Sequence, residues 1–197
     1  MRHRHTVKII MPAISLVRHG KTEANEKKLY CGHTDLDLSA LGENELRELK
    51  KTVVYPDAEI FATSGLKRAI LTLKILYNVT NFINIPELKE YNFGTFEMKS
   101  HDELQFEQSY IKWIEDENVR CPGGESRVEF YKRVASGFVQ LKGLSKTVVC
   151  ICHGGVIAVL MENLFPGEKG FYDWQPQFGR GYTINYGIDK IMDYMML

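Results

Sequence analysis

Short apolar runs alternate with helical patterns along most of this sequence, and that alternation is the feature that most constrains its fold. Extended, apolar patterns occur at 13–17, 60–63, 84–85, 147–152 and 182–188. Between them, apolar residues recur every three or four positions, as on the buried face of a helix. Strands that alternate with helices favour a mainly parallel sheet between two helical layers. We therefore expect an α/β fold, a three-layer α/β/α sandwich with a mainly parallel central sheet.

Capping residues and chain breakers suggest where the helices begin and end. Ser39 is a favourable cap for a helix with Leu41, Leu46 and Leu49 on one face, and Ser64 is expected to cap the next helix. The run Ser100-His101-Asp102-Glu103 has the form of a capping box. The remaining patterns predict helices at 66–77, about 100–114, 125–141 and 156–164.

Length and composition favour an ordinary globular domain. The chain has 197 residues, of which 44% are hydrophobic and 25% charged, and such a chain can bury a substantial core. Neither an internal repeat nor a low-complexity linker divides the sequence. We expect one domain over residues 1–197, with residues 93–125 as an excursion that forms a small helical cap over the site.

Charge and cysteine content bear on partners and location. The formal net charge is zero, which gives no electrostatic footprint for nucleic acid or an anionic membrane. The basic N-terminal segment, residues 1–5, is not followed by a long apolar stretch, so a secretory signal is not expected. The four cysteines are too few for a disulfide scaffold and favour reduced thiols in the cytosol. With no Cys-x-x-Cys pair, the sequence does not favour zinc.

Two histidines stand at the carboxyl ends of the two strongest strand patterns. Arg18-His19-Gly20 follows one, and His153-Gly154-Gly155 follows the other. In a doubly wound sheet both histidines are expected in the crevice outside the strand ends. Gly154 and Gly155 open a helix, whose N-terminal N–H groups attract anions. Arg68 starts near another strand end, so two guanidiniums and two imidazoles are expected to form a phosphate pocket.

Four sequence blocks carry a resemblance to a known family. Leu-Val-Arg-His-Gly-Lys-Thr-Glu-Ala-Asn at 16–25 resembles the signature of the histidine phosphatase superfamily, which has the phosphoglycerate-mutase-like fold. Residues 63–69, 88–94 and 152–155 are similar to its later motifs and occur in the family's order. Four blocks in register are hard to obtain by chance.

The resemblance implies a role for each matching residue. It identifies His19 as the nucleophile that becomes phosphohistidine, and Glu90 as the general acid that later deprotonates water. Arg18, Arg68 and His153 match phosphate-binding groups, with Asn25 and Gly154 nearby. Thr22, Cys31 and Gly32 are the candidates for lining the substrate pocket.

The physical chemistry agrees with these roles, and it requires neither a metal nor another cofactor. A nucleophilic imidazole must be neutral, and neighbouring arginines disfavour its cationic form. The arginines also neutralise the transferring phosphoryl group. We therefore expect neither a metal nor an organic cofactor.

The sequence departs from the family pattern after Phe93-Gly94. Met98 stands where the family commonly has glycine, and we expect it to narrow or reshape the pocket entrance. Mutases of the superfamily carry a longer insertion after the acid-bearing motif, whereas this chain soon reaches Pro-Gly-Gly-Glu-Ser at 122–126. That run resembles the phosphatase branch, without separating α-ribazole phosphatases from fructose-2,6-bisphosphatases or broad-specificity phosphatases.

The sequence therefore predicts a phosphomonoesterase that acts on a small phosphorylated metabolite, with α-ribazole 5′-phosphate as one candidate. Two alternatives stay open: a cofactor-dependent phosphoglycerate mutase, and a non-catalytic phosphate-binding module. We expect no nucleic-acid or membrane partner. The oligomeric state is open, with a homodimer as one possibility.

Overall fold

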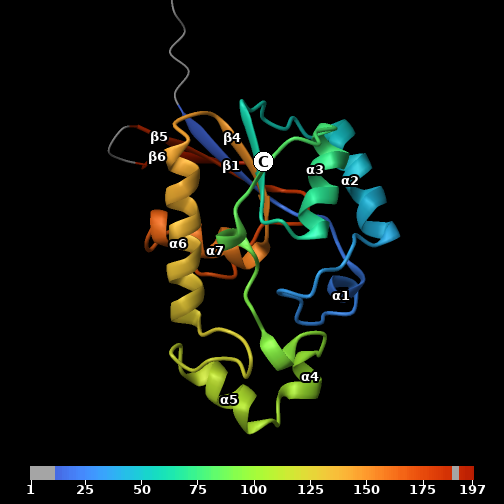
Figure 1. The fold of residues 1–197 in the computed structure, drawn as a ribbon, viewed down its shortest axis with the longest axis vertical. Helices are drawn as coiled ribbons and strands as arrows, with labels where there is room; N and C mark the ends of the chain where they lie inside the picture. Colours follow the sequence, from blue (N-terminus) through green and yellow to red (C-terminus); the bar gives the residue numbers. More distant parts are fainter. Residues whose placement is uncertain (1–11, 188–190) are drawn as a thin grey trace, which may run out of the picture.

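The computed structural model describes residues 12–187 and 191–197 (Figure 1). The strands are β1 (Ala13–Arg18), β2 (Ile60–Thr63), β3 (Ile83–Asn84), β4 (Val148–Cys152), β5 (Gly181–Tyr186) and β6 (Ile191–Met196). The α-helices are α1 (Glu23–Glu26), α2 (Ala40–Thr52), α3 (Lys67–Tyr77), α4 (His101–Leu104), α5 (Gln108–Glu115), α6 (Arg127–Gly143) and α7 (Gly154–Leu164). Two short 3₁₀ helices are η1 (Pro86–Leu88) and η2 (Gly94–Phe96).

The strands form one sheet in the order β3-β2-β4-β1-β5-β6. The strands β3, β2, β4 and β1 run parallel, while β5 and β6 are antiparallel additions beside β1. The predicted α/β class with a mainly parallel sheet is confirmed. β6 was not predicted. The predicted strand at 182–188 ends at Tyr186, and Ile188 lies outside the described residues, as do residues 1–5.

Alternation along the central strands divides the core between two helical layers. On β4, Cys150 and Cys152 join the core cluster that includes α6 and α7, whereas Val149 and Ile151 join the one that includes α2 and α3. Successive side chains of a strand point to opposite faces, so each strand supplies both layers. Figure 1 shows α6 and α7 on one side of the sheet and α2 and α3 on the other.

One predicted helix is two helices in the structure. The predicted capping box at Ser100 is present, but its helix ends at Leu104, and α5 begins at Gln108. Both Leu104 and Tyr110 are buried. In one continuous helix these residues would face about 120° apart. The break between α4 and α5 allows both side chains to reach the same core.

Two other predicted helix starts are wrong. Leu66, and not Ser64, is the N-cap of α3, because the Ser64 hydroxyl instead meets His153 Nε2 at 2.7 Å. The helix predicted to begin at Glu125 begins at Arg127, where Ser126 and Glu129 form a capping box. Leu41, expected on the buried face of α2, is 48% exposed.

The segment at 93–125 contains α4 and α5, which lie at the opposite end of the molecule from the C-terminus (Figure 1). Among the described residues, no helix is both long and apolar enough to cross a bilayer.

Met98 gives a test of backbone strain in this region. Its φ is +62°, in the left-handed region, and its N–H is fixed to the Tyr30 carbonyl at 2.8 Å. A side chain in this backbone conformation costs about 1–2 kcal/mol of folding free energy. Glycine relieves that strain, but the gain is partly offset because glycine has more conformational freedom in the unfolded chain. We expect Met98→Gly to raise the free energy of unfolding by about 0.5–1 kcal/mol, measured by urea denaturation. Met98→Ala keeps the strain and is the control; equal effects of the two substitutions would contradict the prediction.

Candidate active site

Three adjacent parallel strands deliver their following residues to one edge of the sheet. Arg18 pairs in register with Cys152, and Thr63 with Ile151. The next residues, His19, Ser64 and His153, therefore meet: the two imidazole centroids lie 5.0 Å apart, and Ser64 Oγ contacts His153 Nε2. The crevice outside the strand ends is where open α/β sheets place their ligands.

The hydrogen bonding of His19 fixes which ring nitrogen is free. His19 Nδ1 lies 2.6 Å from the Gly20 carbonyl oxygen. A carbonyl can only accept, so Nδ1 carries the proton and donates it. In the neutral ring the lone pair is then on Nε2. The side chain is 5% exposed, which leaves this lone pair largely free of competing water.

Both imidazoles are held neutral. Burial, followed by the charge of Arg68, lowers the pKa of His19 well below 6.5; the Gly20 hydrogen bond opposes this, and Arg18 adds to it. Burial, Arg68 and His19 likewise lower the pKa of His153. At neutral pH the site therefore contains two cationic guanidiniums and two uncharged imidazoles.

The two arginines are anchored through backbone carbonyls. Arg68 is fully buried and donates to the Thr34 and Gly32 carbonyls at 2.9 and 2.6 Å. Arg18 donates to the Pro176 carbonyl at 2.8 Å, and its guanidinium lies 3.9 Å from the centroid of the Phe178 ring.

Each anchored arginine keeps one buried nitrogen without a partner. Within residues 12–187 and 191–197, Arg18 Nε, Arg68 Nε and His153 Nδ1 are buried and make no hydrogen bond. An unsatisfied buried donor costs about 1–3 kcal/mol. These unbonded arginine N–H groups can donate to an anion with several acceptor oxygens, such as phosphate.

Glu90 lies at the N-terminus of α7. Gly155 N donates to Glu90 Oε2 at 2.9 Å, and Tyr91 N donates to Oε1 at 3.0 Å. A carboxylate here is favoured by the free N–H groups and the helix dipole. The N–H of Gly155, expected to attract a ligand anion, is thus used by Glu90. Burial lowers the pKa of Arg18, and the charge of the Glu90 carboxylate partly offsets this effect.

The glycine pair at the start of α7 makes room for these two side chains. A Cβ at Gly154 would lie 2.9 Å from Arg18 Cζ, and one at Gly155 would lie 2.4 Å from Glu90 Oε1. Gly154 and Gly155 are therefore needed for the close approach of a guanidinium and a carboxylate to the helix end.

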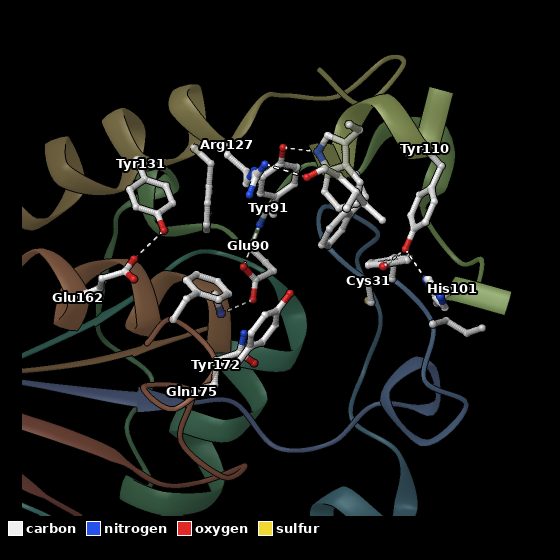
Figure 2. Close-up of a pocket in the computed structure, with 18 of the residues that line it drawn as sticks. Cys31, Glu90, Tyr91, His101, Tyr110, Arg127, Tyr131, Glu162, Tyr172 and Gln175 are labelled. Atoms are coloured by element: carbon white, nitrogen blue, oxygen red, sulfur yellow. Dashed lines mark hydrogen bonds between the residues drawn. The ribbon is translucent and has the colours of Figure 1, made fainter. Parts of the chain in front are cut away.

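A cavity of about 760 Å³ opens beside Arg18, Glu90 and Gly155. Nine aromatic side chains line it, from α6, from residues 93–125 and from the segments that follow α1, η1 and α7: Tyr30, Tyr91, Phe93, Tyr110, Trp113, Phe130, Tyr131, Phe171 and Tyr172. In Figure 2, Glu90 lies between the hydrogen-bonded pairs Tyr131–Glu162 and Tyr110–His101. The cavity is much larger than a phosphate group, so it can accommodate the rest of a substrate.

The remaining residues expected near the substrate differ in whether they line the cavity. Cys31 lines the cavity, whereas Thr22 is fully buried as the N-cap of α1. Asn25 uses its Oδ1 atom to accept from Thr22. Gly32 contributes its backbone: its carbonyl binds Arg68, and its N–H donates to Glu97. Met98, expected to reshape the entrance, is absent from the residues that line the cavity.

Glu97 is a residue that sequence reasoning did not single out. Its carboxylate accepts from the backbone N–H groups of Gly32, His33, Thr34 and Phe93 at 2.9–3.2 Å. It thereby shapes the loop whose carbonyls hold Arg68. A single glutamate between Phe96 and Met98 carries no local signal for contacts with residues more than sixty positions away. Ser64 and Phe178 were missed for the same reason.

Metal ligation has no support in the described part of the chain. Residues 12–187 and 191–197 contain no cluster of three or more His, Cys, Asp or Glu side chains arranged to hold an ion. The four cysteines are unpaired thiols.

Comparisons with known proteins agree on one family. The model described as "Histidine phosphatase superfamily (branch 1)" matches residues 14–180. An adenosylcobalamin/alpha-ribazole phosphatase from Salmonella typhimurium is 32% identical, with 76% of this chain and 77% of that protein covered. A 2,3-bisphosphoglycerate-dependent phosphoglycerate mutase from Cytophaga hutchinsonii is 34% identical, with 91% of each covered.

A solved structure of a similarly named protein has the same fold. The crystal structure of a putative alpha-ribazole-5′-P phosphatase from Escherichia coli K-12 superimposes with a TM-score of 0.84 at 25% identity. That match covers 95% of this chain and 96% of the other.

The close approach of Glu90 to α7 predicts a specific cost for a side chain at Gly155. We expect Gly155→Ala to displace the Glu90 carboxylate and to be about 1–2 kcal/mol less stable than Gly143→Ala in urea denaturation. Gly143, the last residue of α6, is the matched control, since a Cβ there meets no atom within 4 Å. Equal stabilities of the two variants would show that the contact is unimportant.

The neutral histidines predict how stability depends on pH. Their pKa values are below 6.5 when folded and return to about 6.5 on unfolding. Their contribution to stability is therefore complete above pH 6.5. As pH falls, the unfolded chain binds protons that the folded chain does not, and the free energy of unfolding decreases, by up to about 2.7 kcal/mol per pH unit for the two sites.

The measurement compares urea denaturation between pH 7.5 and 5 for the unsubstituted protein and for His19→Gln/His153→Gln. The doubly substituted protein should show a shallower decrease, since the other titratable groups are common to both. Identical slopes would mean that these histidines are not held neutral.

Proposed function

The chain belongs to the histidine phosphatase superfamily, branch 1, and on that premise we propose that it hydrolyses a small phosphomonoester through a phosphohistidine at His19. The observation that carries this proposal is the state of His19. Its Nδ1 proton is committed to Gly20, which leaves a lone pair on Nε2. Burial and Arg68 lower its pKa, as they lower that of His153, so the ring is neutral.

In the first step of the proposed reaction, His19 Nε2 attacks phosphorus and the bond from phosphorus to the ester oxygen breaks. Glu90, as a carboxylic acid, donates its proton to the departing oxygen, so an alcohol leaves. Arg18 and Arg68 donate to the equatorial oxygens and offset their charge. His153, with Ser64 donating to Nε2, can carry its proton on Nδ1 and add a third donor.

In the second step, the Glu90 carboxylate removes a proton from water as the water oxygen attacks phosphorus. The bond between phosphorus and Nε2 breaks, inorganic phosphate is released, and both His19 and Glu90 return to their starting protonation states. Glu90 is suited to both steps because it lines the cavity where the alcohol leaves and where water enters.

We propose that the substrate carries a flat aromatic group, with α-ribazole 5′-phosphate as the leading candidate. Nine aromatic side chains line the cavity, and aromatic side chains favour contact with another ring. A benzimidazole riboside offers such a ring, whereas phosphoglycerate is small and acidic. The alpha-ribazole phosphatases among the relatives support the same choice. Residues 93–125 serve in this proposal as the cap that supplies part of the wall.

A phosphoglycerate mutase is the second candidate, favoured by the relative from Cytophaga hutchinsonii that matches over 91% of the chain. In that case phospho-His19 would transfer its phosphoryl group to a second hydroxyl group instead of water.

The four unpaired cysteines support a further proposal, that the protein works in the reducing cytosol.

The decisive experiment offers α-ribazole 5′-phosphate, phosphoserine, p-nitrophenyl phosphate and 3-phosphoglycerate with 2,3-bisphosphoglycerate, and measures phosphate and 2-phosphoglycerate. We expect phosphate release, fastest from α-ribazole 5′-phosphate, and acid-labile phosphate trapped on the protein. His19→Ala should lose both by more than about 10³-fold.

Turnover by His19→Ala at the unsubstituted rate would refute the phosphohistidine route. Rapid formation of 2-phosphoglycerate without phosphate release would select the mutase. Phosphate binding without turnover of any substrate would identify a binding module instead.

A further inference from the structure

Arg133, on α6, is the centre of a hydrogen-bond network under the segment that carries Glu90. Its Nη1 donates to the carbonyls of Glu87 and Lys89 at 2.7 and 2.9 Å, and its Nη2 donates to the Glu90 carbonyl at 3.2 Å. These contacts fix the backbone immediately before and at Glu90.

Glu125 completes the network from the opposite side. Arg133 Nε and Nη2 donate to its two carboxylate oxygens at 3.1 and 2.6 Å, and Asn92 N donates to Oε1 at 2.8 Å. The Glu125 carbonyl accepts from the Tyr91 hydroxyl at 2.8 Å. Since the side chains of the pair are only 22% and 11% exposed, water competes weakly for these bonds, and the ion pair holds both ends of residues 87–92.

The Glu90 side chain has no comparable support of its own. Its carboxylate is bonded only to backbone N–H groups, those of Tyr91 and Gly155, among the described residues. Its position therefore depends on where the backbone of residues 87–92 lies relative to α7. Arg133 ties the backbone of these residues to α6 through the Glu87, Lys89 and Glu90 carbonyls.

We infer that Arg133 is a positioning residue for catalysis, which holds Glu90 where it can transfer a proton to and from the reacting oxygens. The inference rests on the proposed function, in which Glu90 is the acid. A guanidinium is required because three carbonyls and a bidentate carboxylate use donors in a fixed planar fork, which an ammonium cannot supply. A misplacement of about 1 Å at a reacting group can cost about 10²-fold in rate.

Leaving-group chemistry separates positioning from a general effect on the fold. An alkyl phosphate expels a strongly basic alkoxide and needs the acid, whereas p-nitrophenolate leaves without much help. We therefore compare kcat/KM, which reports the phosphorylation step alone, on glycerol phosphate and on p-nitrophenyl phosphate for Arg133→Lys, Arg133→Met and Glu90→Gln. Arg120→Met is the matched control, because Arg120 pairs with Glu129 and forms neither a hydrogen bond nor an ion pair with residues 87–92.

For Arg133→Met we expect kcat/KM on the alkyl phosphate to fall about 10- to 100-fold, with less than about a 3-fold fall on the aryl phosphate. Arg133→Lys, which keeps a cation beside Glu125 and so protects the fold, should fall less but with the same selectivity. In Glu90→Gln/Arg133→Lys the second substitution should add no further loss, since both act on one proton transfer. Arg120→Met should behave like the unsubstituted protein.

Equal losses on both substrates, or additive losses in the double variant, would overturn the inference and leave a structural role for Arg133. If Glu90→Gln itself shows no selectivity for the alkyl phosphate, the assignment of Glu90 as the acid fails first. The two failures are thus distinguished by the single Glu90 variant.

Discussion

The parallel pairing of β1 with β4 is the constraint on which the site depends. The register sets Arg18 opposite Cys152, and the ladder continues one step further as His19 N donates to the Cys152 carbonyl at 3.0 Å. A shift of one residue would send His19 or His153 to the other face, because side chains alternate along a strand. The buried alternation of Cys150 and Cys152 against Val149 and Ile151 opposes such a shift, so core packing fixes the geometry of the two imidazoles.

Charge in the site is stabilised mainly by backbone dipoles. Arg68 is fully buried, yet its direct partners are the Gly32 and Thr34 carbonyls. A direct carboxylate partner would neutralise the guanidinium and compete with a bound phosphate. Glu97 instead acts one step away, where its carboxylate accepts the N–H groups of the same loop. The loop is ordered by an anion while its carbonyls remain directed at the cation, and the positive charge stays available for a ligand.

The sequence predicted the features that depend on local pattern and missed those that depend on distant contacts. Strand ends at His19 and His153 follow from apolar runs and glycine, and the capping box at Ser100 follows from spacing. Ser64 shows the limit: a serine before a helix favours a cap, but its hydroxyl contacts the histidine that follows β4. The division of the predicted helix at 100–114 likewise follows from the need to bury Leu104 and Tyr110 together, which no local pattern reveals. The positions of Glu97 and Arg133 became visible only when residues far apart in the chain were brought together.

A buried cage, formed by His19, Arg68 and His153, borders the cavity, and under the proposed reaction this boundary separates phosphate transfer from substrate choice. His19, Arg68 and His153 are almost fully buried, whereas Arg18 and Glu90 also line the cavity. Under the proposed reaction, the phosphoryl group lies on the cage side, where the same oxygens are presented by every substrate. The ester oxygen lies at the boundary, and Glu90 is placed there to exchange its proton. Everything beyond that oxygen meets the aromatic walls, so substrate choice is determined by side chains that take no part in holding phosphate. Under the same proposal, residues 93–125 bear on substrate choice, while β1, β4 and α7 position the groups that act on phosphate.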